Sequence, residues 1–333
     1  MDLDERILAL TKLGSCLRND FIKDYRDKIN EIQIVNPWFT IENIEFAIDY
    51  WGNQLNLNSL NFWLNQYRCS DINFKKILVI SAGNIPLVSF HDILCVLITG
   101  HKLFLKLSSK DNILIPLILN ELLKINKEFE NQIFFIEKIE SKKYDAIIAT
   151  GSDSTAKYFD YYFKNKKKII RKNRSSVAVI DGNENDTDLE LLADDIFKYF
   201  GLGCRSISQI LVPENYDLNK LFKAFYKYKD LINHQKYMNN YDYHKTILLM
   251  DKQIFYDNGF LLIKKSKQLH SSVSLLNYFE YSDINEVKHF LEINNDQIQC
   301  VVSKTNNKLG CAQNPELYSY ADNVDVIDFL ISL

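Results

Sequence analysis

The stretch Ile77-Leu78-Val79-Ile80-Ser81-Ala82-Gly83-Asn84-Ile85-Pro86 decides how this chain is interpreted. It begins with a short, uninterrupted apolar run, which is typical of a parallel strand covered on both faces. Gly83-Asn84 then marks a turn, and an apolar helix follows that ends near Gly100. The stretch therefore predicts a strand–turn–helix unit with the polar side chain of Asn84 just beyond the carboxyl end of the strand.

The same alternation recurs in the next part of the chain. Apolar runs at residues 103–107, 133–136 and 146–150 indicate further strands. Ser108-Ser109-Lys110-Asp111 offers capping side chains for a helix that runs to about Asn126. Repeated units of this size predict a doubly wound α/β sheet, which binds ligands beyond the carboxyl ends of its strands.

A second α/β region begins near residue 170. Residues 177–180 read as a strand and Asp181-Gly182 as a turn. Apolar residues then recur at the spacing i, i+3, i+4, i+7, i+8 and i+11, which predicts an amphipathic helix ended by Gly201 and Gly203. The residues on that face are Leu189, Leu192, Ala193, Ile196, Phe197 and Phe200. Further on, we expect strands at 207–212, 246–250 and 300–302 and a helix at 221–231.

Composition excludes several function classes. The 333 residues are 47% hydrophobic, enough for one large core or two medium ones, and a net charge of −3 gives no reason to expect nucleic acid as a partner. The six cysteines form no C-x-x-C pair or Cys/His cluster, so we expect neither a metal site nor a disulfide framework. The apolar runs are too short to span a bilayer and the acidic N-terminus is unlike a signal peptide. We expect a cytoplasmic protein without an integral membrane segment.

Cys204 is a candidate nucleophile. It lies in Gly201-Leu202-Gly203-Cys204-Arg205-Ser206, between the predicted helix and a strand, where side chains often face a cleft. The neighbouring Arg205 would favour the thiolate, the reactive form of the side chain. A buried structural cysteine is the alternative interpretation, and these residues alone leave both open.

Two turns are candidate binding elements. The Asn84 amide could donate a hydrogen bond to an oxyanion, or it could be ordinary turn chemistry. Thr150-Gly151-Ser152 could present backbone N–H groups to a phosphate, or it could simply end a strand. The sequence has neither G-x-G-x-x-G nor a Walker motif. The basic run from Lys164 to Arg174 is interpreted either as a solvated surface or as a rim that attracts phosphate-bearing ligands.

Taken in order, these segments resemble the aldehyde dehydrogenase superfamily over residues 75 to 305. They look most like its acyl-CoA reductase branch, the type that supplies aldehyde for bacterial luminescence. Asn84-Ile85-Pro86 matches the N-F-P motif that carries the oxyanion asparagine, and Thr150-Gly151-Ser152 matches the T-G-S motif near the cofactor pyrophosphate. Lys106-Leu107-Ser108-Ser109 matches the K-P-S-E motif that holds the adenosine ribose, and Gly201-Leu202-Gly203-Cys204 matches the nucleophile motif G-Q-x-C.

The departures from these motifs refine what the resemblance implies. Hydrolytic members carry E-L-G-G, whose glutamate activates water, whereas this chain reads Arg171-Lys172-Asn173-Arg174-Ser175 and has no carboxylate there. Without that base, acyl-thioester chemistry is favoured over acid formation. Ser109 stands where an acidic residue would repel a 2′-phosphate, so NADPH is expected. Gln268 aligns with the glutamate of E-x-F-G-P, which helps to seat the nicotinamide ribose.

The resemblance implies an α/β, aldehyde-dehydrogenase-like fold with a doubly wound cofactor-binding domain and a second α/β catalytic domain. We expect a helical segment at residues 1–70 packed on the cofactor domain, that domain at 71–170, the catalytic domain at 171–290 and a returning C-terminal segment at 291–333. The implied activity is NADPH-dependent reduction of an acyl-CoA or other acyl thioester to aldehyde through a thioacyl group on Cys204. The alternatives are an acyl-phosphate reductase and a non-catalytic partner of an acyl-transferring enzyme, and the oligomeric state is left open, with a homo-oligomer compatible.

Overall fold

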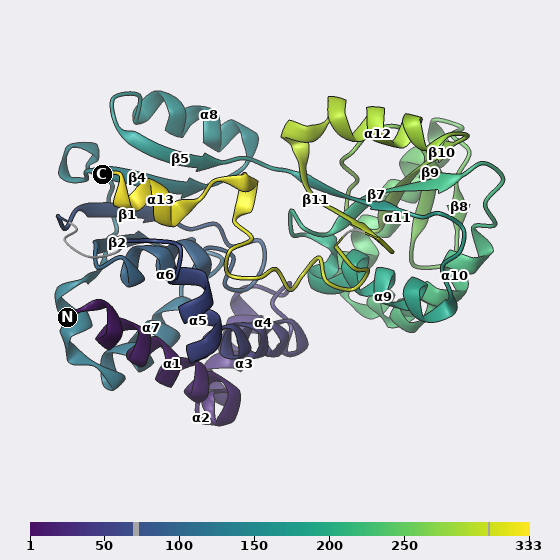
Figure 1. The fold of residues 1–333 in the computed structure, drawn as a ribbon. Coiled ribbons are helices and arrows are strands. Elements are labelled where there is room, and N and C mark those ends of the chain that lie inside the picture. The colour runs from purple at the N-terminus through teal and green to yellow at the C-terminus, as the bar shows by residue number, and fades with distance from the viewer. Residues whose placement is uncertain (69–72, 306) are drawn as a thin grey trace. The chain divides into compact units, whose positions relative to one another are not determined.

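The computed structural model describes residues 1–68, 73–305 and 307–333, and the chain divides into two compact units (Figure 1). Unit 1 comprises Met1–Lys172 and Glu316–Leu333, and unit 2 comprises Asn173–Pro315. Residues 291–315, which the sequence analysis grouped with the C-terminal segment, therefore lie in unit 2. The boundary expected between residues 70 and 71, and Cys69, fall outside the described residues.

Unit 1 is built on a five-stranded parallel sheet with the strand order β3-β2-β1-β4-β5. Its strands are β1 (Lys76–Ile80), β2 (Lys102–Lys106), β3 (Ile133–Phe135), β4 (Ala146–Thr150) and β5 (Lys167–Arg171). The chain adds β2 and β3 on one side of β1, then returns to add β4 and β5 on the other. The order thus reverses between β1 and β4, and this topological switch point is where open α/β sheets hold ligands.

Helices cover the sheet of unit 1, and they include the N-terminal segment and the C-terminal α13 (Figure 1). They are α1 (Leu3–Asn19), α2 (Phe21–Asp24), α3 (Arg26–Val35), α4 (Ile41–Gln54), α5 (Leu57–Leu64), α6 (Phe90–Ile98), α7 (Leu114–Ile125), η1 (Lys127–Asn131), η2 (Ser141–Lys143), α8 (Asp153–Tyr162), η6 (Ala321–Asn323) and α13 (Val326–Ile331). Thr40 caps α4 as its sequence predicts, since its side chain accepts a hydrogen bond from the Asn43 N–H. α1 packs on α4 and α7, and α13 packs on α6.

One predicted cap of unit 1 is wrong. α7 begins at Leu114, its N-cap position is Ile113, and no side chain caps it from that position. Ser108–Asp111 instead forms a tight turn closed by a bridge between Ser108 and Asp111. The Ser108 hydroxyl accepts a hydrogen bond within this turn, and the Asp111 carboxyl group accepts one from the Leu87 N–H, a distant partner that local spacing cannot reveal.

Unit 2 is built on a six-stranded sheet with the strand order β11-β6-β7-β10-β9-β8. Its strands are β6 (Ser175–Val179), β7 (Ile207–Pro213), β8 (Tyr256–Asp257), β9 (Leu262–Lys265), β10 (Leu275–Tyr281) and β11 (Ile298–Ser303). All neighbours pair parallel except β8 and β9. Together with the first sheet, this architecture confirms the predicted α/β fold with two α/β units.

The helices of unit 2 correct one strand prediction. They are α9 (Asp186–Phe197), η3 (Lys198–Gly201), α10 (Asn219–Phe225), η4 (Tyr226–Asn233), α11 (Gln235–Met250), α12 (Ile284–Ile293) and η5 (Asn295–Gln297). The predicted strand at 246–250 is the end of α11, where only Leu248 is buried and the Thr246 hydroxyl donates to the Asp242 carbonyl. A short apolar run is compatible with either element, and the helix that starts at the His234 cap decides it.

The amphipathic helix of unit 2 ends three residues earlier than its apolar pattern suggests. α9 stops at Phe197, and Tyr199, Phe200 and Gly201 all have left-handed backbone angles, with φ of 53°, 58° and 75°. The side chains of Tyr199 and Phe200 are buried, so their packing stabilises a conformation that costs L-residues free energy. None of the described helices is long and apolar enough to cross a membrane.

Candidate active site

Three predicted site segments meet at one edge of the unit 1 sheet. Ile80, at the end of β1, pairs with Lys106 at the end of β2 and with Ala149 near the end of β4. The Asn84 turn, the Lys106–Ser109 segment and the Thr150–Ser152 turn follow these three neighbouring strands. The fold therefore brings them side by side at the carboxyl ends of the strands, with the switch point between β1 and β4 among them.

The Asn84 turn is held against the segment that follows β2. Asn84 itself is exposed, whereas Gly83 and Leu87 on either side are buried. A side chain at position 83 is excluded, because a Cβ atom there would lie 2.7 Å from the Ser108 Oγ. The turn thus presents one polar side chain from an otherwise packed backbone, as a preorganised hydrogen-bond donor requires.

Lys106 and Ser109 are suited to a polar ligand. Lys106 is half-buried at the end of β2 and Ser109 is exposed. Among the described residues, neither side chain has a hydrogen-bonding or ion-pair partner. Ser108 differs, since its hydroxyl accepts the Lys110 N–H at 3.2 Å. An unpaired, half-buried ammonium beside a hydroxyl at the switch-point edge fits the ribose or phosphate of a nicotinamide cofactor.

The Thr150-Gly151-Ser152 turn begins α8 as the sequence suggests. The Ser152 side chain caps the helix by accepting the Thr155 N–H, and Gly151 is needed because a Cβ atom there would lie 3.0 Å from Thr155. The Gly151 N–H donates to the Arg171 carbonyl at 3.2 Å, so it is not available to a phosphate. Any phosphate contact would therefore come from N–H groups later in the turn, where Asp153 adds a negative charge.

Arg171, which stands where hydrolytic relatives carry the E-L-G-G motif, is a structural residue. It is buried, and its guanidinium forms a bidentate pair with Asp92 of α6, with distances of 2.7 and 3.2 Å. A third bond donates to the Ala321 carbonyl at 2.7 Å. Other members of the basic run also bond the backbone of unit 1, Lys166 to the Tyr144 carbonyl among them. Much of this run holds β5 in place and does not form an open cationic rim.

Cys204 is half-buried in the loop that precedes β7 in unit 2. Two contacts fix the backbone of this loop. The Ser176 hydroxyl, on β6, donates to the Cys204 carbonyl at 2.9 Å, and the Ser206 N–H donates to the Gly203 carbonyl at 3.0 Å. The loop is therefore braced by the neighbouring strand, and Cys204 as a residue is only partly buried.

A second thiol lies near this loop. Cys300 on β11 donates from its Sγ to the Ser176 Oγ, at 3.1 Å. Burial raises the pKa of the Cys300 thiol. Cys300 is thus expected to stay protonated and to act as a hydrogen-bond donor, and Cys204 stays the candidate nucleophile that the sequence predicts.

Gln268 is exposed in the connection between β9 and β10. Polar side chains tie this connection to the sheet. The Ser208 hydroxyl donates to the Leu269 carbonyl at 2.7 Å, and the Asn277 amide donates to the Gln268 carbonyl at 2.8 Å. Since Ser208 lies at the start of β7, just after the Cys204 loop, the structure brings the Gln268 segment to the same end of that strand.

Sequence reasoning missed two buried carboxyl groups beside these segments. Asp111 is 2% exposed, and burial raises its pKa from 3.8 to about 7. Asp195 is 0% exposed, and burial raises its pKa from 3.8 to about 6. Asp195 accepts the Gly310 and Ala312 N–H groups at 2.7 and 2.9 Å. For Asp195 the available signal was an acidic residue within the apolar pattern of α9, because such groups are rarely buried without a partner. Asp111 lies in a polar stretch that gives no such signal.

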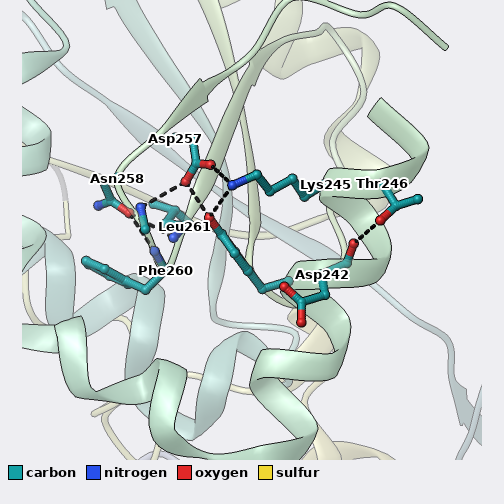
Figure 2. A network of polar contacts seen from close by, with 9 residues as sticks. Asp242, Lys245, Thr246, Asp257, Asn258, Phe260 and Leu261 are labelled. Atoms are coloured by element: carbon teal, nitrogen blue, oxygen red, sulfur yellow. Dashed lines mark hydrogen bonds and ion pairs between the residues drawn. The ribbon is translucent and has the colours of Figure 1, made fainter. Parts of the chain in front are cut away.

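A further polar network lies elsewhere in unit 2 (Figure 2). Lys245 of α11 reaches the Asp257 carboxylate at 2.7 Å, and the Tyr241 hydroxyl donates to the same carboxylate at 2.6 Å. The Gly259 N–H also donates to the Asp257 carboxylate, at 2.8 Å. This network fixes the β8–β9 turn on α11. No group of three or more metal-ligating side chains occurs among the residues that the structure describes.

Known proteins resemble this chain in sequence pattern and in fold. The family model of acyl-CoA reductase (LuxC) matches residues 57–228, more than half of the chain. No curated protein matches the sequence.

Solved structures with a similar fold are aldehyde dehydrogenases. An indole-3-acetaldehyde dehydrogenase complexed with NAD+ is 12% identical, with a TM-score of 0.69 over 91% of this chain and 72% of that one. Betaine aldehyde dehydrogenase from Staphylococcus aureus is 13% identical, with a TM-score of 0.67 over 91% and 75%. Aldehyde dehydrogenase 21 from Physcomitrella patens is 14% identical, with a TM-score of 0.64 over 100% and 84%. These likenesses confirm the aldehyde-dehydrogenase-like fold.

Proposed function

The chain belongs to the acyl-CoA reductase (LuxC) family, and from that premise we propose that it reduces an acyl-CoA, or another acyl thioester, to the corresponding aldehyde. The observation that carries the proposal is Cys204, a half-buried thiol in a braced loop. Family membership and fold together indicate an oxidoreductase that acts on acyl or aldehyde groups. The thioacyl route and the choice of cofactor are the finer parts of the proposal.

The first step is acyl transfer to the protein. The Cys204 thiolate attacks the thioester carbonyl carbon, and a carbon–sulfur bond forms as the carbonyl oxygen takes up negative charge. The Asn84 amide and the Cys204 backbone N–H donate hydrogen bonds to this oxyanion. Coenzyme A then leaves as a thiolate, and because its pKa is about 8.5 it needs no general acid.

The second step is reduction of the thioacyl group on Cys204. Reduced nicotinamide, when bound, supplies the hydride to the carbonyl carbon. The same two donors hold the oxyanion that results, and its collapse breaks the bond to Cys204, which releases aldehyde and restores the thiolate. Arg171–Ser175 contains no carboxylate, and Arg171 is committed to Asp92, so this segment offers no base to activate water against the thioester.

Lys106, Ser108 and Ser109 would hold the adenosine ribose, and Thr150, Gly151 and Ser152 would lie at the pyrophosphate. The absence of a carboxylate from Ser108 to Lys110 supports NADPH, because no negative charge there repels a 2′-phosphate. Gln268 would contact the nicotinamide ribose through its amide. Lys106 is the strongest of these assignments, since its ammonium has no other partner among the described residues.

A substrate panel tests the proposal. The purified protein is offered acyl-CoA of several chain lengths, the matching acyl phosphates, and either NADPH or NADH, while loss of reduced nicotinamide and formation of aldehyde are measured. We expect aldehyde from acyl-CoA with NADPH. Aldehyde from acyl phosphate alone would indicate the acyl-phosphate reductase alternative. No turnover and no NADPH binding would indicate a non-catalytic partner of an acyl-transferring enzyme.

A further inference from the structure

Asp111 is a buried acidic residue to which the proposed mechanism gives no role. It lies in the turn after β2 and is 2% exposed. Its Oδ2 atom accepts the Leu87 N–H at 3.4 Å, while its Oδ1 atom has no hydrogen-bond partner among the described residues. The Asp111 side chain thus ties the turn that contains Asn84 to the turn that follows β2.

The residue that Asp111 contacts has an unusual backbone. Leu87 has a φ of 58°, in the left-handed region that a leucine rarely adopts, and its side chain is 1% exposed. Such a conformation is unfavourable for a leucine and persists only where the surroundings hold it. The Leu87 carbonyl in turn accepts the Phe90 N–H at 2.9 Å, which sets the start of α6. The path of the chain just after Asn84 therefore depends on what holds Leu87.

A second contact holds the other side of the same turn. Asn36 is buried, and its amide donates to the Gly83 carbonyl at 3.4 Å and to the Lys110 carbonyl at 3.2 Å. Asn84 therefore lies between two anchored residues, Gly83 and Leu87. Both contacts connect the Asn84 turn to the 108–111 turn, which follows β2.

We propose that Asp111 is a positioning residue, which fixes the Leu87 backbone and thereby aims the Asn84 amide at the carbonyl oxygen of the substrate. The inference rests on the proposed function, because it acts through the oxyanion role of Asn84. A donor contributes to catalysis only when it is held at hydrogen-bonding distance from the developing charge. Loosening the anchor therefore lowers the rate of acyl transfer while leaving ground-state binding unchanged.

The test compares Asp111→Ala, Asn84→Ala and the double variant with the wild type. The rate of acylation by acyl-CoA is measured in single turnovers without cofactor, together with KM for acyl-CoA and Kd for NADPH. Because Ala offers no acceptor to the Leu87 N–H, we expect Asp111→Ala to slow acylation about tenfold with KM and Kd within twofold of the wild type. In the Asn84→Ala background it slows acylation less than twofold further, because the group it positions is gone.

Asp145→Ala is the matched control. The Asp145 carboxylate accepts the Lys76 N–H at 2.7 Å, so it makes the same kind of bond to the opposite end of β1. This control is expected to acylate at the wild-type rate. If Asp111→Ala does not fold, Asp111→Ser, whose shorter side chain places its hydroxyl farther from the Leu87 N–H, replaces it in the same comparison.

The outcomes separate the inference from the function. If Asn84→Ala slows acylation but Asp111→Ala does not, or if the two losses multiply in the double variant, the positioning role is wrong and the proposed function stands. If Asn84→Ala acylates at the wild-type rate, the oxyanion assignment fails and takes the positioning role with it. If Asp111→Ala is slow and the double variant is no slower than Asn84→Ala alone, both the positioning role and the oxyanion assignment are supported.

Discussion

The two candidate site segments, the Asn84 turn of unit 1 and the Cys204 loop of unit 2, are held in place in opposite ways. The Asn84 turn follows its strand and is anchored on both sides by buried side chains, Asn36 and Asp111. The Cys204 loop precedes its strand and is anchored at its own carbonyl by Ser176. A buried carboxyl group thus supports the proposed hydrogen-bond donor, and a hydroxyl group supports the proposed nucleophile. A carboxylate beside Cys204 would oppose formation of the thiolate, so the difference follows the chemistry of each group.

The largest effect is expected when the thiol of the Cys204 loop is removed. Cys204→Ala should lower turnover by at least about 10⁴-fold, because no other group forms the covalent bond. Binding of NADPH, measured by fluorescence, should stay within twofold of the wild type, since Cys204 is not among the residues proposed to hold the cofactor. Cys311→Ala removes an exposed thiol from the same unit and should leave turnover unchanged. Retained activity in Cys204→Ala would end the assignment of the nucleophile.

The next effect compares the two buried carboxyl groups as pH changes. Their folded-state pKa values, about 7 for Asp111 and about 6 for Asp195, exceed the ordinary 3.8. The folded protein therefore holds these protons to higher pH than the unfolded chain. Titration of Asp111 lowers the free energy of unfolding as pH rises from about 4 to 7, by on the order of 4 kcal/mol at most. Titration of Asp195 lowers it as pH rises from about 4 to 6, by on the order of 3 kcal/mol at most.

Urea-unfolding midpoints of the wild type and of each Asp→Asn variant, measured from pH 4 to 8, check this comparison. Replacing Asp111 should flatten the wild-type decline up to about pH 7, and replacing Asp195 should flatten it only up to about pH 6. Identical pH profiles for the two variants would show that the carboxyl groups do not titrate separately.

A smaller effect concerns cofactor binding in unit 1. Lys106→Ala should raise the Kd for NADPH about tenfold, equivalent to about 1.4 kcal/mol, through loss of one charge-assisted hydrogen bond. Lys102→Ala is the control, because Lys102 is exposed at the opposite end of β2 and should bind NADPH normally. Titration of NADPH fluorescence distinguishes the two. Equal affinity in both variants would remove Lys106 from the cofactor site.

The smallest expected effect concerns the brace of the Cys204 loop. Ser176→Ala removes the donor to the Cys204 carbonyl and the acceptor of the Cys300 thiol, and should lower the free energy of unfolding by about 1 kcal/mol. Acylation should slow severalfold as the loop loosens. Ser175→Ala is the matched control, since Ser175 is buried on the same strand but its side chain bonds no described residue. Equal acylation rates in the two variants would show that the brace has no part in catalysis.

The sequence predicted those features that depend on neighbours along the chain. Apolar runs located β1, β2 and β4, and their carboxyl ends pointed to the edge where Asn84, Lys106 and Gly151 gather. Hydrogen bonds between distant segments could not be read in this way. Asp111 was interpreted as a helix cap but accepts the Leu87 N–H, and Asp195 accepts the Gly310 and Ala312 N–H groups from much later in the chain. Local spacing carries no information about such partners.

The left-handed backbone of Tyr199 and Phe200 shows the same limit. Their aromatic side chains continue the apolar pattern of α9, and the pattern alone predicts a longer helix. Burial of both rings fixes a turn that local preference disfavours, and this turn leads directly into the Cys204 loop. Tertiary packing decides such conformations, and it determines where the helix ends and the candidate site begins.

The most direct test of the account is to trap the acyl group. The protein is incubated with a labelled acyl-CoA in the absence of cofactor, and the intact mass and the labelled peptide are determined. We predict one acyl group per chain, attached to Cys204 and released as aldehyde when NADPH is added. A label on any other residue, or no covalent label while aldehyde is still produced, would contradict it.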